Sequence, residues 1–118
     1  MDRLLALIER GASPPLTRSA AEEHFLGLIR KAQLREPEVN MQVEGYEVDF
    51  VWRSERLVVE IDGRAFHSSD RSFESDRRRD GVLVAAGLRV MRVTWRQIVN
   101  EPEALLVRLT QALARPWG

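Results

Sequence analysis

Two acidic residues, Asp49 and Glu60, are the side chains of this sequence best placed to do chemistry together. Each lies in a segment, Tyr46–Trp52 or Leu57–Asp62, whose apolar residues alternate with period two, as in strands buried on one face. If residues 53–56 form a hairpin loop, the two acids face each other with Cβ atoms about 4.5–5.5 Å apart. Because such like charges repel, a hard divalent cation, which prefers carboxylate oxygens, is the simplest compensation.

The same register gives the hairpin one acidic face and one apolar face. Glu47 falls opposite Asp62, with Val51 and Val58 between the two acidic pairs. A shift of one residue would place each acid opposite an apolar side chain, so a merely solvated acidic hairpin is the alternative. The apolar face then consists of Trp52 with Leu57, Phe50 with Val59, and Val48 with Ile61.

The composition describes an ordinary water-soluble domain. The chain has 118 residues, of which 44% are hydrophobic and 31% charged, enough for one core. Its formal net charge is zero, so any attraction for nucleic acid must be local. The absence of cysteine excludes disulfides and zinc–thiolate sites. Since no apolar run approaches the roughly 18 residues of a membrane span, and no signal-peptide pattern opens the chain, we expect a cytoplasmic protein.

The remaining pattern predicts an α/β domain over residues 17–118, preceded by a short helix and a Pro-rich connector over 1–16. Ser19 with Glu22 three residues later predicts a capping box at a helix start. The sheet is expected to be mixed, with a three-stranded meander and one crossover strand flanked by helices. The elements expected after that capping box are a helix ending near Gln33, strands over 39–43, 46–52 and 57–62, a loop over 63–72, a helix over 73–86, a strand over 88–95, and a last helix capped by Asn100 with Glu103.

This order of elements resembles the core of the PD-(D/E)XK nuclease superfamily, that is, a restriction-endonuclease-like fold. The run Val48-Asp49-Phe50, ten intervening residues, then Glu60-Ile61-Asp62-Gly63 and His67, is similar to the very-short-patch-repair-like (Vsr-like) endonucleases, and closest to their uncharacterised bacterial relatives. The segments Ser19-x-x-Glu22 and Asp76-Arg77-Arg78, and the strand ending at Trp95, extend the resemblance over most of the chain.

The resemblance implies an endonuclease that hydrolyses DNA phosphodiester bonds with Mg²⁺ or Mn²⁺. It makes Asp49 and Glu60 the metal ligands, lets the carbonyl of Ile61 complete the shell, and puts Glu22 at the edge of the metal site. Capping alone also explains Glu22. The sequence is compatible with both roles of Glu22.

The superfamily's catalytic lysine falls at position 62, where this sequence has Asp62. The only lysine, Lys31, is expected on the opposite face of its helix from Glu22. Water activation would then depend on the metal alone or with His67, whose imidazole exchanges protons near neutral pH. Asp62 itself either belongs to the site or opposes Glu47 on a wet face, and His67 is either functional or structural.

Several arginines follow the acidic edge and offer bidentate hydrogen bonds to DNA phosphates. Nearby acids nearly cancel their charge, so an ordinary solvated helix face is the alternative, and it is favoured for Arg79. The candidate DNA contacts are Arg64, Arg71, Arg77 and Arg78.

Two other functions remain open from the sequence. In the first case, the domain is a non-catalytic nucleic-acid- or protein-binding module that lost its chemistry with the lysine. In the second case, it is the nuclease module of a toxin or defence system. In the second case the helix over 2–10 would be the remnant of a junction with a DNA-binding or antitoxin-like domain upstream.

Overall fold

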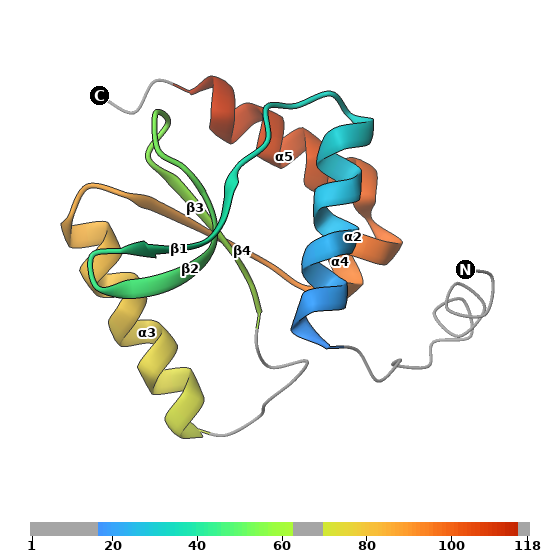
Figure 1. The fold of residues 1–118 in the computed structure, drawn as a ribbon. Coiled ribbons are helices and arrows are strands. Elements are labelled where there is room, and N and C mark those ends of the chain that lie inside the picture. Colours follow the sequence, from blue (N-terminus) through green and yellow to red (C-terminus); the bar gives the residue numbers. More distant parts are fainter. Residues whose placement is uncertain (1–16, 63–69, 116–118) are drawn as a thin grey trace.

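A mixed four-stranded sheet with helices on both faces forms the core of the protein (Figure 1). The computed structural model describes residues 17–62 and 70–115, and the side chains of 17–62 and 74–115. The helix and connector expected over 1–16 lie outside these residues. The strands follow one another in the order β1-β2-β3-β4, so the predicted α/β fold with a meander and a crossover strand is confirmed. None of the described helices combines the length and the apolar character needed to cross a membrane.

The strands β1, Glu38–Val43, β2, Tyr46–Trp52, and β3, Leu57–Ile61, form the predicted antiparallel meander. The β2–β3 pairing has the predicted register, with Phe50 opposite Val59 and Trp52 opposite Leu57. The strand β4, Arg89–Val93, pairs in parallel with β3. Its pairing sets Glu60 opposite Arg92 and Ile61 opposite Val93.

The helices are α2, Arg18–Lys31, α3, Asp70–Ala85, α4, Trp95–Asn100, and α5, Pro102–Ala114. Helix α3 makes the crossover from β3 to β4, as a parallel connection requires. It begins at residue 70, so the loop predicted over 63–72 ends earlier than expected. Gly87 follows the helix with φ 91°, the left-handed conformation that glycine supplies after a helix end.

Three predicted boundaries are wrong, and at two of them a side-chain cap forms at another residue. Helix α2 is capped by Thr17, whose Oγ1 accepts from the amide of Ala20 at 3.1 Å, and Ser19 lies inside the helix. The last strand stops before Trp95, since Thr94 and Gln97 form a capping box that opens α4. Asn100 ends α4 instead of capping α5, which begins with proline at its first position.

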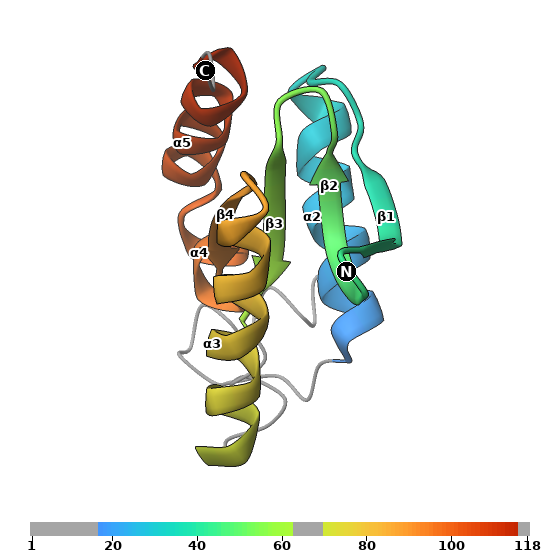
Figure 2. The ribbon, with the colours of Figure 1, turned by 90° about the vertical axis from the view of Figure 1, so that its left-hand side faces the viewer.

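Two hydrophobic clusters lie on opposite faces of the sheet. The larger joins the inward residues of β2 and β3 to α2, α4 and α5. The smaller lies under α3, which covers the other face (Figure 2). Its buried members are Val43, Val48, Val51, Val58 and Leu83.

The position of Val48 corrects the predicted apolar face, because it packs in the smaller cluster and not with Phe50 and Ile61. The β1–β2 pairing passes over Asn40, which has φ 53°. Val48 and Phe50, only two residues apart, pack in clusters on opposite faces of the sheet, so the two-residue period of β2 is broken at Asp49, near this left-handed residue of β1. The face predicted to be acidic and wet is therefore partly a hydrophobic core.

Candidate functional site

Asp49 connects three elements at the end of the hairpin. Its residue is 8% exposed, and Oδ2 accepts a hydrogen bond of 2.9 Å from the amide of Ile61 in β3. Nη1 of Arg18, in the first turn of α2, lies 3.0 Å from the same oxygen. The Asp49 carboxylate thus contacts the main chain of the neighbouring strand just after Glu60.

Glu60 is a buried carboxylate, 1% exposed. Its Oε1 lies 3.1 Å from Nη2 of Arg79 in α3, yet it accepts no hydrogen bond from any residue that the structure describes. Burial raises the pKa of Glu60 to about 7, helped by the charges of Asp49 and Asp80 and opposed by Arg79. Glu60 is therefore an acid that releases its proton near neutral pH.

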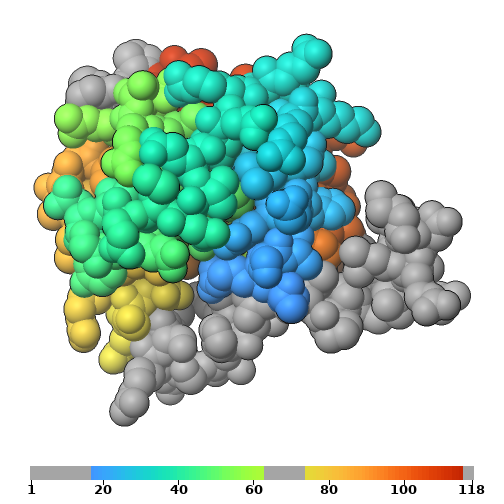
Figure 3. All heavy atoms as spheres, in the orientation of Figure 1, coloured from blue at the N-terminus to red at the C-terminus, as the bar shows by residue number. Residues whose placement is uncertain are grey.

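Glu22 is a buried neighbour of Asp49 and not a helix cap. It is 8% exposed, and its Oε1 accepts from Nδ2 of Asn40 in β1 at 3.3 Å. Burial raises the pKa of Glu22, and the charge of Asp49 adds to the effect. Helix α2 and the β1–β2 hairpin lie side by side on one face of the molecule (Figure 3), which explains how Asn40 reaches this carboxylate.

Asp62 follows β3, and its amide donates to the carbonyl of Val93 at 2.7 Å. Its residue helps to line a cavity of about 510 Å³ between α3 and β4. Arg77, exposed on α3, lines the same cavity, and Arg78 is exposed on that helix. The positions of His67 and Arg64, and the side chain of Arg71, lie outside the described residues.

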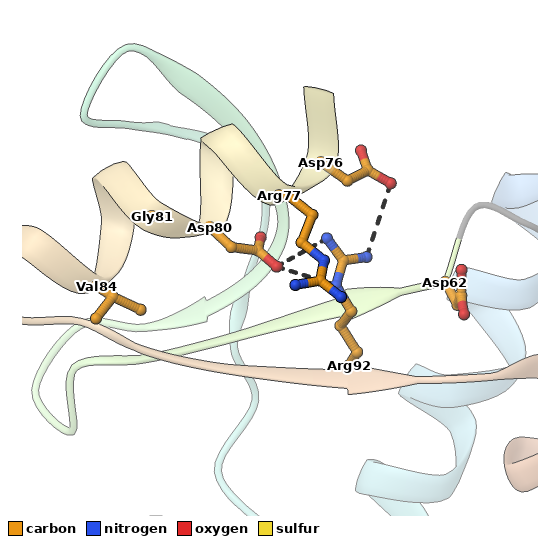
Figure 4. Close-up of a pocket in the computed structure, with 7 residues that line it drawn as sticks. All are labelled: Asp62, Asp76, Arg77, Asp80, Gly81, Val84 and Arg92. Carbon is orange, nitrogen blue, oxygen red and sulfur yellow. Dashed lines mark hydrogen bonds and ion pairs between the residues drawn. The ribbon is translucent and has the colours of Figure 1, made fainter. Parts of the chain in front are cut away.

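The charged residues around Glu60 were missed or misjudged by sequence reasoning. Arg79 does not lie on a solvated face, since its side chain is 23% exposed and contacts Glu60 and Asp76. Arg92 of β4 binds Asp80 through Nε at 3.0 Å and Nη2 at 2.9 Å (Figure 4). A basic residue between apolar neighbours within β4 was a possible signal for Arg92, but its register against Glu60 was not readable from sequence.

The residues present suit a divalent cation. Asp49 and Glu60 come from adjacent strands, interact electrostatically, and offer hard oxygen donors. The buried Oε1 of Glu60 without a hydrogen bond is the kind of atom that a metal ion satisfies. Within the described ranges no three His, Cys, Asp or Glu side chains converge on one metal position, so two carboxylates and main-chain oxygen are the donor set to consider.

Taken together, the mixed sheet and the paired carboxylates at its hairpin define a restriction-endonuclease-like domain. The chain belongs to the restriction-endonuclease-like family REase_MTES_1575, whose model matches residues 22–113. Among solved structures, the catalytic domain of the homing endonuclease I-Bth0305I is similar in fold, with a TM-score of 0.65 at 18% sequence identity, over 78% of this chain and 91% of that one. No protein of curated function matches the chain.

Proposed function

We propose that the protein is an endonuclease that hydrolyses DNA phosphodiester bonds with Mg²⁺ or Mn²⁺ held by Asp49, Glu60 and the carbonyl of Ile61. The observation that carries the proposal is the burial of two interacting carboxylates on adjacent strands in a chain of a restriction-endonuclease-like family. Buried acids with perturbed pKa values are typical of functional sites.

When bound, such a cation lowers the pKa of a water molecule and neutralises charge on the phosphate. The chain's own part is to present its carboxylates in the ionised state. The amide of Ile61 fixes the orientation of Asp49, while Arg18 and Arg79 hold the two acids as ion pairs. A bound metal ion would be held by these same carboxylate oxygens, in place of the guanidinium contacts.

We assign Glu22 the role of proton acceptor at the edge of the site. It lies beside Asp49, and burial raises its pKa, which makes the carboxylate a better proton acceptor. His67 and Asp62 are the other candidates for handling the attacking water. For DNA contacts, Arg77 and Arg78 have the exposure on α3 that phosphate binding needs, and Arg64 and Arg71 remain predictions from sequence.

A non-catalytic binding domain is the second candidate, and one observation favours it. Asp62 occupies the position of the superfamily's lysine, and both ligand carboxylates carry arginine partners, as purely structural ion pairs do. The finer proposals of Vsr-like relationship, of a toxin or defence module, and of a separate upstream unit over 1–16 rest on the sequence alone.

Nicking of supercoiled plasmid separates the two candidates. We expect relaxed and linear products with Mg²⁺ or Mn²⁺ and none with EDTA. Glu60→Gln, which keeps the shape of the side chain and removes its charge, should abolish the products. Absence of cleavage in both metals, or a Glu60→Gln protein that cuts as fast as wild type, would refute the proposed nuclease.

A further inference from the structure

The proposed nuclease needs a positively charged side chain that stays near the scissile phosphate while Asp49 and Glu60 bind the metal ion. The single lysine of the sequence lies too far away. Lys31 ends α2, thirteen residues after Arg18, which contacts Asp49. At a rise of about 1.5 Å per residue the two helix positions lie about 20 Å apart. A lysine role at the site therefore has to be taken by another residue.

Three arginines approach the two ligand carboxylates, and they differ in distance. Arg18 lies 3.0 Å from Asp49 and Arg79 lies 3.1 Å from Glu60, so both occupy oxygens that a metal would use. Nη2 of Arg92 stands 4.0 Å from Oε1 of Glu60. Arg92 can therefore keep its place when Glu60 binds a metal ion.

Arg92 is also held in a fixed orientation. Asp80 on α3 binds its Nε and Nη2, while Nη1 lies 3.8 Å from Asp76, beyond direct hydrogen-bond distance. Burial works against its charge, but Asp80, Glu60 and Asp76 outweigh burial and raise the pKa of Arg92. The guanidinium keeps its proton, and among the described residues its Nη1 has no acceptor within hydrogen-bond distance.

The side chain of Arg92 borders the cavity between α3 and β4. Arg92 lines that cavity together with Asp62, Asp76 and Arg77, and its side chain is 30% exposed. The close-up shows Arg92 reaching from its strand toward the acids of α3, while Asp62 lies apart at the end of β3 (Figure 4). A ligand oxygen in the cavity can reach Arg92 without displacing either ligand carboxylate.

We infer that Arg92 is a catalytic residue, whose guanidinium binds a non-bridging oxygen of the scissile phosphate in place of the lysine absent at position 62. The inference rests on the proposed nuclease function. In the reaction the oxygen of water bonds to phosphorus and its proton passes to Glu22, while the bond to the leaving oxygen breaks and that oxygen takes a proton from solvent. Arg92 donates hydrogen bonds without transferring a proton. An arginine held by acids before the substrate arrives requires no reorganisation.

A binding measurement with altered DNA tests this contact without relying on turnover. The bond that wild type cuts is first mapped, and duplexes with either a normal phosphate or a neutral methylphosphonate at that bond are then titrated in Ca²⁺. Arg92→Ala should weaken binding of normal DNA about 10- to 100-fold, the value of a hydrogen bond to a charged group. On methylphosphonate DNA, Arg92→Ala and wild type should bind equally.

Arg89→Ala is the matched control. Arg89 lies on the same strand, is similarly half-buried, and donates from Nη2 to the carbonyl of Glu55 at the opposite end of β4. Its loss should affect binding of both duplexes to the same small extent. If Arg92→Ala weakens both duplexes equally, as a structural arginine would, the inference is wrong while the nuclease function stands. A wild type that cuts no DNA refutes both.

Chemical rescue provides the second readout. Arg92→Ala should lower the cleavage rate roughly 10²- to 10³-fold, the cost of one transition-state donor, and added guanidinium should restore part of it, since the cavity then has room for the ion. Arg89→Ala should show no such rescue. Should Arg92→Ala fail to fold, Arg92→Lys retains the charge beside Asp80, and its loss of about 10-fold in affinity should again vanish on methylphosphonate DNA. Equal loss on both duplexes would overturn the inference for this variant too.

Discussion

At the scale of single residues, the two carboxylates proposed to bind metal are stabilised in different ways. Asp49 accepts from the amide of Ile61 and pairs with Arg18, whereas Glu60 is almost fully buried against Arg79 and its Oε1 accepts no hydrogen bond from the residues described. Burial of an ionised carboxylate is costly unless its partners compensate. We therefore expect protonation of Glu60 to govern metal binding at the proposed site.

The stability of the metal-free protein should depend on pH through Glu60. Its folded pKa of about 7 lies above the ordinary 4.5, so the folded state binds the proton more tightly than the unfolded state. The contribution to stability is full below about pH 4.5 and is lost as pH rises to about 7, by up to about 1 kcal/mol per pH unit. Urea unfolding at several pH values measures this loss.

Glu60→Gln is the control for that titration, since it cannot ionise. Its stability curve should lack the decline that wild type shows between these pH values. A wild-type curve parallel to that of Glu60→Gln would show that Glu60 does not titrate in this range.

Replacements of Asp49 should separate activity from stability. Asp49→Ala leaves the Ile61 amide without its acceptor and should lower the free energy of unfolding by about 1–3 kcal/mol, whereas Asp49→Asn retains an acceptor oxygen and should lose less. Both should be inactive as nucleases. Thermal melting in EDTA and plasmid nicking are the measurements, and a fully active Asp49→Asn protein would remove this residue from the metal site.

The sequence was sufficient to find this acidic pair but not its surroundings. Alternation and spacing brought Asp49 and Glu60 together, because both strands are short and joined by a tight loop. The partners Arg18, Arg79 and Arg92 arrive from α2, α3 and β4, and contacts between elements distant in sequence depend on packing that periodicity does not encode.

At the scale of elements, Leu83 is the buried apolar residue of α3 among its described side chains. This side chain is fully buried among Val48, Val51 and Val58. Leu83→Ala should lower the free energy of unfolding by about 2–5 kcal/mol by leaving a cavity. Val84→Ala, at a position 58% exposed on the same helix, is the control and should change it little. Chemical denaturation compares the two, and equal effects would show that α3 is not packed as described.

The turn after α3 should be sensitive to glycine replacement. Gly87 has φ 91°, and a Cβ there would lie 2.8 Å from Nη1 of Arg56, so Gly87→Ala should cost about 1–2 kcal/mol from the left-handed backbone alone. Gly27→Ala in α2, where no atom lies within 4 Å of the added Cβ, should instead stabilise by about 1 kcal/mol. Thermal melting decides, and a stable Gly87→Ala protein would contradict the assigned turn.

Elements were predicted well where a pattern was long and poorly where two signals lay close together. The hairpin register and the C-terminal glycine of α3 were correct because turn geometry fixes them locally. The start of α2 was predicted at the wrong residue and α4 was missed. In both places Thr17 and Thr94 cap more effectively than the alternatives a few residues away. In the sequence, Trp95 extends the apolar pattern of the strand before it. Its backbone instead begins helix α4.

At the scale of the whole molecule, the balance of positive and negative charge limits how the protein could attract DNA. The formal net charge is zero, so the chain has no general attraction for DNA, and affinity has to come from a bound cation and the arginines beside it. The central claim is therefore that Asp49 and Glu60 together bind a divalent metal ion.

Titration calorimetry with Mn²⁺ tests that claim most directly. At a pH above the pKa of Glu60, wild type should release or absorb heat for binding at one site, and its melting temperature should rise with metal concentration. Glu60→Gln should show neither effect while remaining folded. If wild type gives no heat and no change in melting temperature at millimolar Mn²⁺, or if Glu60→Gln binds as tightly, the proposed metal centre is contradicted.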